Sequence, residues 1–149
     1  MESSDWRERH GHRLLQLGIL LFLLGLLVGL AVPRFAVPRL GLSTHVLGIM
    51  QGIFLIVMGL LWPTLRFGPA VSRIGVVLAV YGCLAAWTAN LAAAVWGAGS
   101  GMLPIAAGQS HGTALQEGLI AIALRSAGAS LIAFSALVLW GLRRYGAAR

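Results

Sequence analysis

Four long apolar runs divide this 149-residue chain, and they limit its fold more than any other feature. The runs cover residues 14–32, 45–62, 72–96 and 115–142. About 20 apolar residues in a helix cross the hydrocarbon core of a bilayer, so each run predicts a transmembrane helix. Proline and glycine are concentrated between the runs, as expected of turns. The sequence therefore predicts one all-α domain over residues 1–149, an integral membrane four-helix bundle.

The charged residues support the same setting and argue against a soluble binding protein. They make up only 10 % of the chain, whereas a soluble domain has roughly 25 %. All 11 basic residues are arginines, and most of them flank the apolar runs. A nucleic-acid-binding protein would instead gather its basic residues on one face of a soluble domain. The pattern therefore indicates contact with the lipid bilayer and no nucleic-acid partner.

The positions of the arginines also predict the orientation of the chain, because basic residues are concentrated on the cytoplasmic side of membrane proteins. Only Arg34 and Arg39 lie on one side of the predicted bundle. The eight on the other side are Arg7, Arg9, Arg13, Arg66, Arg73, Arg143, Arg144 and Arg149. Both termini are therefore expected to face the cytoplasm, in a multi-pass protein of the inner membrane.

His45 opens the second apolar run, and glycines follow it on the same helical face. Gly48 and Gly52 lie three and seven residues after it. Such a stripe of small residues permits the close approach of another body. That body is either a neighbouring helix or a flat cofactor whose metal is bound by His45, because a neutral imidazole is a common metal ligand. Gly25 and Gly29 form a second small-residue pair, and together the pairs predict a homo-oligomer.

Few polar side chains lie inside the runs, and each is a candidate for structure or for function. Gln51 and Asn90 are amides, which in hydrocarbon either join helices or line a cavity. Arg125 lies deep in the fourth run and is a functional candidate, with snorkelling to the interface as the alternative. His10 and His12, in the charged N-terminal tail, are expected to be solvated. No role is predicted for Tyr81, His111 and Glu117.

The segment that contains His45 resembles a known family. It reads Pro-Arg-Leu-Gly-Leu-Ser-Thr-His over residues 38–45, and Gly48 and the pair Gln51-Gly52 follow. This block is similar to the corresponding block of the hydroxylaminobenzene mutases, which are small bacterial membrane enzymes. The resemblance implies an isomerase in the bacterial inner membrane. Its substrate would be a small aromatic hydroxylamine, converted to a 2-aminophenol by intramolecular hydroxyl transfer.

A more distant resemblance is to the styrene oxide isomerases, four-helix membrane proteins described as homotrimers that bind haem b. His45 corresponds to their haem-ligating histidine, and Gln51 and Asn90 correspond to two of their asparagines. The resemblance implies haem b with His45 as the metal ligand and its iron as a Lewis acid, while Gln51 and Asn90 orient the substrate as catalytic residues. The further residues expected to contact the cofactor are Gly48, Gly52 and Arg125.

Two departures from that family weigh against epoxide chemistry in this chain. The amide of Gln51 is one methylene longer than asparagine, and Ala94 stands where the family has a tyrosine. An epoxide isomerase of the styrene-oxide type nevertheless stays open as an alternative. The other alternative is a non-catalytic membrane subunit, in which the glycine stripes only assemble helices. Purified protein with a Soret band would favour the haem enzyme over this structural subunit.

Overall fold

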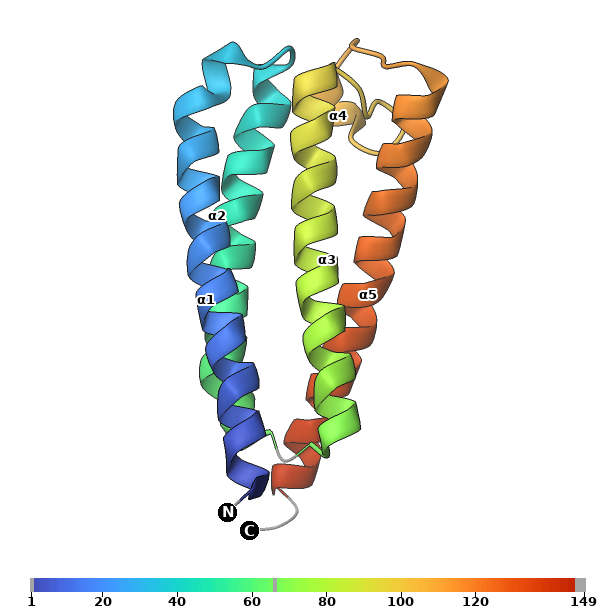
Figure 1. The fold of residues 1–149 in the computed structure, drawn as a ribbon. Coiled ribbons are helices and arrows are strands. Elements are labelled where there is room, and N and C mark those ends of the chain that lie inside the picture. The colour runs from blue at the N-terminus through green and yellow to red at the C-terminus, as the bar shows by residue number, and fades with distance from the viewer. Residues whose placement is uncertain (1, 66, 147–149) are drawn as a thin grey trace.

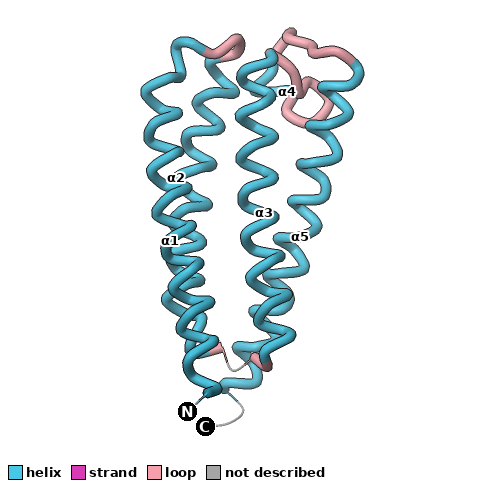
Figure 2. Tube along the Cα trace, viewed as in Figure 1, coloured by secondary structure: helices cyan, strands magenta, loops and turns pink. Residues whose placement is uncertain are grey.

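The computed structural model describes residues 2–65 and 67–146, and every regular element in that part of the chain is helical. Four helices are long and apolar enough to cross a bilayer. They are α1 (Glu2–Ala31), α2 (Pro38–Leu61), α3 (Pro69–Trp96) and α5 (Ala114–Gly146). The short elements are η1 (Val32–Arg34), η2 (Trp62–Thr64) and α4 (Pro104–Ala107). The all-α prediction with four long apolar helices is thus confirmed (Figure 2).

The four long helices form two antiparallel pairs, α1 with α2 and α3 with α5 (Figure 1). Contact between α2 and α3 joins the pairs. The beginning of α1 and the end of α5 lie at the same end of the bundle, as an even number of crossings requires. The other end carries η1, α4 and the connector between α3 and α5.

The glycine stripe of α2 packs against α1 and not against an open space. A Cβ atom added to Gly52 would lie 2.7 Å from the backbone nitrogen of Phe22 and 2.8 Å from the carbonyl oxygen of Gly18. The backbones of the two helices therefore touch, which only residues without a side chain permit. The facing pairs are Gly11 with Gly59, Gly18 with Gly52 and Gly25 with Gly48.

The glutamate at the start of α5 organises the connector at the far end of the bundle. The carboxylate of Glu117 accepts hydrogen bonds from the backbone N–H groups of Gly99 at 2.8 Å and Gly112 at 3.0 Å. Longer bonds at 3.3 and 3.4 Å come from Ser100 and Gly101. One carboxylate thus accepts hydrogen bonds from several backbone N–H groups, so Glu117 ties the connector of residues 97–113, which contains α4, to α5. The sequence left this residue without a role.

Candidate active site

His45 is held in a defined orientation by α1. Its Nδ1 atom lies 2.8 Å from the carbonyl oxygen of Gly25. A carbonyl only accepts hydrogen bonds, so Nδ1 carries the proton, and the Nε2 atom of the neutral ring keeps a free lone pair. The ring occupies the space left by Gly29, where an added Cβ would lie 2.5 Å from Nδ1. This backbone bond is of the kind that fixes the ring of a metal-ligating histidine.

An apolar groove of about 560 Å³ adjoins His45 on the outer side of the α1–α2 pair. Its other lining residues are Leu26, Gly29, Leu30, Val32, Pro33 and Leu42. His45 is the only coordinating side chain in this lining, and the described residues contain no cluster of three or more potential metal ligands. The groove therefore suits a flat apolar cofactor that already holds a metal ion and needs one further ligand to that ion from the protein.

A second group of polar side chains is buried in the bundle interior. Gln51 and Asn90 are only 8 % and 4 % exposed. The Nδ2 group of Asn90 donates to the carbonyl of Ala86 at 3.0 Å, and its Oδ1 atom accepts a long 3.5 Å bond from the Ser43 hydroxyl. Asn90 is thus tied mainly to its own helix, with one weak link to α2.

Two buried polar atoms in this interior have no hydrogen-bond partner among the described residues: Oε1 of Gln51 and Nε1 of Trp87. One is an acceptor and the other a donor. An unsatisfied buried polar group costs roughly 1–3 kcal/mol, so such atoms are rare unless something binds them. Trp87, which is 7 % exposed, was not predicted as a site residue. Its position in the middle of a membrane span, away from the interfaces where tryptophan is usual, was the available signal.

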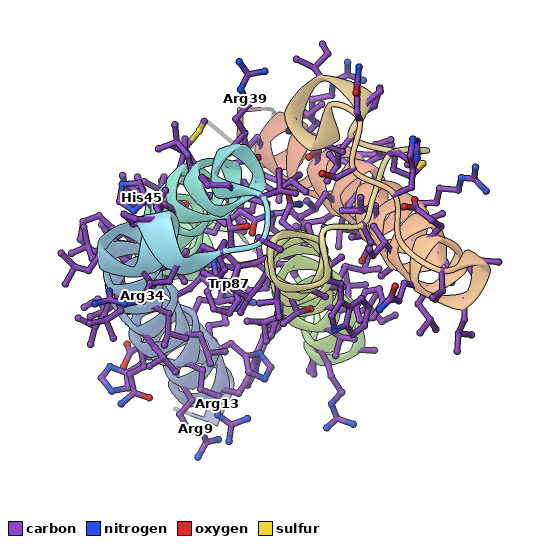
Figure 3. All side chains as sticks on the ribbon, turned by 90° about the horizontal axis from the view of Figure 1, so that it is seen from above. Arg9, Arg13, Arg34, Arg39, His45 and Trp87 are labelled. Atoms are coloured by element: carbon purple, nitrogen blue, oxygen red, sulfur yellow. The ribbon has the colours of Figure 1, made fainter. Side chains whose placement is uncertain are left out.

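Gly48 connects the interior group to His45. A Cβ added to Gly48 would lie 2.7 Å from Nε1 of Trp87, so the indole reaches into the space that the glycine leaves. Gly48 follows His45 by three residues, and Gln51 follows Gly48 by three. Residues at this spacing have Cβ atoms about 5–6 Å apart. The indole of Trp87, from α3, thus lies beside Gly48 of α2, one helical turn from His45 and one from Gln51. His45 faces outward and Trp87 inward (Figure 3).

The remaining predicted site residues lie in two different places. Gly48 and Gly52 contact α1 within the chain. Their assignment as cofactor contacts stays a prediction. Arg125 is exposed on α5, a helix whose main partner is α3, and it lies away from the α1–α2 groove. Two other arginines lie close to His45 in the chain: Arg34 ends η1, and Arg39 is the second residue of α2. Both are therefore at the end of the bundle where α2 begins (Figure 1).

A bundle of four apolar helices with a buried polar group and an oriented histidine defines a membrane protein with a candidate active site. The family model of styrene oxide isomerase matches residues 10–143, and the chain belongs to this family. The chain is 54 % identical over 137 residues to hydroxylaminobenzene mutase HabB of Ectopseudomonas oleovorans, covering 92 % of this chain and 84 % of the relative. It is 40 % identical over 127 residues to HabA of the same organism, covering 85 % and 94 %.

These comparisons confirm both resemblances found in the sequence. No solved structure matches the chain. The names of the family and of the two relatives all describe isomerases, and the chain is an enzyme of that class.

Proposed function

We propose that the chain is a membrane mutase that converts an arylhydroxylamine, such as hydroxylaminobenzene, to a 2-aminophenol. The identity of 54 % to HabB over 92 % of the chain carries this proposal. In the reaction the N–O bond breaks and a C–O bond forms at the ortho carbon. The ring proton displaced there is replaced by one on nitrogen, so substrate and product have the same composition. The proposed setting is the bacterial inner membrane, with both termini in the cytoplasm and the chain assembled as a homo-oligomer, a trimer by resemblance.

The proposed cofactor is haem b, with Nε2 of His45 as the iron ligand. The free lone pair of Nε2 and the apolar walls of the groove fit such a group. Arg34 of η1 and Arg39 of α2 are better placed in one chain to pair with its carboxylates than Arg125, which lies on α5. When bound, ferric haem would supply a Lewis acid for the hydroxylamine oxygen.

The buried polar side chains would orient the substrate. Oε1 of Gln51 would accept a hydrogen bond from the substrate N–H or O–H group, and Nε1 of Trp87 would donate one to its oxygen. Asn90, already anchored to Ala86, would fix the position of the ring edge. The apolar bundle keeps water away from the positive charge that develops on the ring, because water would add to it and scramble the product.

The proposed reaction is tested by supplying membranes that contain the protein with hydroxylaminobenzene and styrene oxide in parallel, in ¹⁸O-labelled water. We expect 2-aminophenol without the label, because the hydroxyl group never leaves the site as free water. The family name favours the second candidate, an epoxide isomerase, which would yield phenylacetaldehyde from styrene oxide. Labelled aminophenol, or turnover of the epoxide alone, would contradict the mutase proposal.

The two buried atoms without a hydrogen-bond partner, Oε1 of Gln51 and Nε1 of Trp87, provide a test that separates a substrate-binding role from a structural one. We expect Trp87→Phe and Gln51→Leu to lower turnover by roughly 10²-fold, the usual effect of removing one transition-state hydrogen bond. The same changes should leave thermal stability unchanged or raise it, because each removes an unsatisfied buried polar atom. The matched control is Trp96→Phe, at the exposed end of the same helix. Loss of stability together with activity would show that both side chains serve only the packing.

A further inference from the structure

A polar pocket of about 240 Å³ lies between α1 and α3, at the end of the bundle where α1 begins. It is separate from the groove beside His45. Its lining residues are Trp6, Arg9, His10, Arg13, Pro69 and Arg73. Three arginines from two helices thus converge on one cavity, next to the first turn of α3. The N-terminus of a helix carries a partial positive charge, which adds to theirs.

His10 is fixed in this pocket by a partly buried hydrogen-bond chain. Its Nδ1 atom lies 3.0 Å from Oγ of Ser72, and Nε1 of Trp62 donates to the same oxygen at 2.8 Å. In the tautomer whose Nδ1 accepts the hydroxyl proton of Ser72, the other ring nitrogen, Nε2, carries a proton and can donate a hydrogen bond. The expectation that His10 is solvated in a tail is wrong, since α1 already begins at Glu2 and the ring packs on α3.

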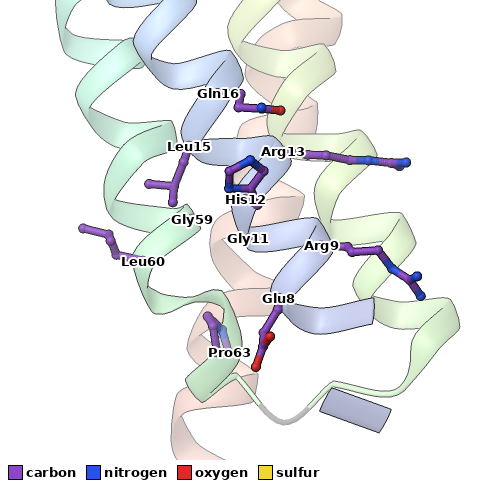
Figure 4. A pocket seen from close by; sticks show the side chains of 10 residues that line it. All are labelled: Glu8, Arg9, Gly11, His12, Arg13, Leu15, Gln16, Gly59, Leu60 and Pro63. Carbon is purple, nitrogen blue, oxygen red and sulfur yellow. The ribbon is translucent and has the colours of Figure 1, made fainter. Parts of the chain in front are cut away.

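Two of the three arginines of the pocket have no acidic partner in the part of the chain that the structure describes. Neither Arg13 nor Arg73 is paired with a described carboxylate, and both side chains are exposed. Glu8, Arg9 and Arg13 also line a neighbouring groove between α1 and α2, but the side chains of Arg9 and Arg13 extend away from the Glu8 carboxylate (Figure 4). The pocket therefore offers several cationic and N–H donors for an anion with several oxygens.

The surroundings indicate what carries that anion. Ile74 and Val77 of α3 follow Arg73 and are 56 % and 59 % exposed, and Leu20 of α1 is 50 % exposed. This apolar surface leads from the pocket into the part of the helices long enough to span the bilayer. A free ion would make no use of it, whereas the acyl chains of a lipid would cover it. We propose that the pocket binds the phosphate of an anionic phospholipid, with Arg13, Arg73 and His10 as the headgroup ligands.

The test is a native mass spectrometry titration of the full-length protein with phosphatidylglycerol and with phosphatidylcholine. An arginine near an anionic lipid surface contributes about 1 kcal/mol. We therefore expect Arg13→Gln and Arg73→Gln each to weaken phosphatidylglycerol binding about fivefold. The matched control is Arg143→Gln, which removes the same charge from an exposed position near the end of α5. It should leave this binding unchanged. Reaction of the buried thiol of Cys83 on heating reports whether each variant is folded.

Each outcome decides for or against the lipid. Selective loss of phosphatidylglycerol in the two pocket variants supports the proposal. Equal loss in the Arg143 control would show that net charge alone retains lipid, and equal binding of phosphatidylcholine would show that the pocket does not select an anionic headgroup. Displacement of phosphatidylglycerol by excess inorganic phosphate would identify a free-anion site and overturn the lipid assignment. If one pocket variant fails to fold, the other still carries the comparison.

Discussion

His45→Ala is expected to leave the protein inserted and assembled but to remove the cofactor and nearly all turnover. The imidazole is the only coordinating group in the apolar groove, so no neighbouring side chain can replace it. Added imidazole should partly restore both properties by occupying the vacated position. The measurement pairs the Soret absorbance of purified protein with its rate of 2-aminophenol formation.

Two further variants separate coordination from packing at this position. Gly29→Ala places a methyl group 2.5 Å from Nδ1 of His45, so it should turn the ring and lower cofactor content while His45 remains. His111→Ala removes an exposed histidine bonded to Ser100 and serves as the control, with no expected effect on colour or turnover. Full activity in His45→Ala would refute the site assignment. If the natural protein is active but colourless, the haem proposal is wrong and the mutase proposal stands.

Gly52→Leu is expected to separate α1 from α2. The new Cβ would lie 2.7 Å from the backbone nitrogen of Phe22 and 2.8 Å from the carbonyl oxygen of Gly18, and backbone atoms cannot move aside as a side chain can. Overpacking of a core typically costs 1–3 kcal/mol, and a backbone clash lies at the upper limit, so we expect a loss of about 3 kcal/mol or more. Thermal unfolding in detergent measures this loss.

The control for this prediction is Gly128→Leu in α5, where an added Cβ would have no neighbour within 4 Å. It makes the same change in side-chain size and helix propensity at a site with free space. A Gly52→Leu protein as stable as this control would show that α1 does not pack on the glycine stripe. The stripe would then be free for a cofactor or for a second copy of the chain.

The sequence by itself determined the number of long helices, the all-α class and the family. In a bilayer the backbone has no water to bond to, so a run of about 20 apolar residues has little choice but a helix. The block of residues 38–45 was specific enough to point to the mutases, and the comparisons confirm that resemblance. Gln51 and Asn90 were also found in advance as buried amides, because a polar group inside an apolar run is conspicuous.

Only the tertiary structure decided which surfaces meet. Lipid and protein interior are equally apolar, so hydropathy does not distinguish the face of a helix that packs from the face that meets lipid. The glycine stripe therefore predicted the close approach of either a helix or a cofactor, and the structure places α1 against it. The contact of His10 with Ser72 joins residues 62 apart in the chain, and that of Glu117 with Gly99 joins residues 18 apart. No periodicity encodes such pairs, because they depend on how helices and connectors are placed around one another.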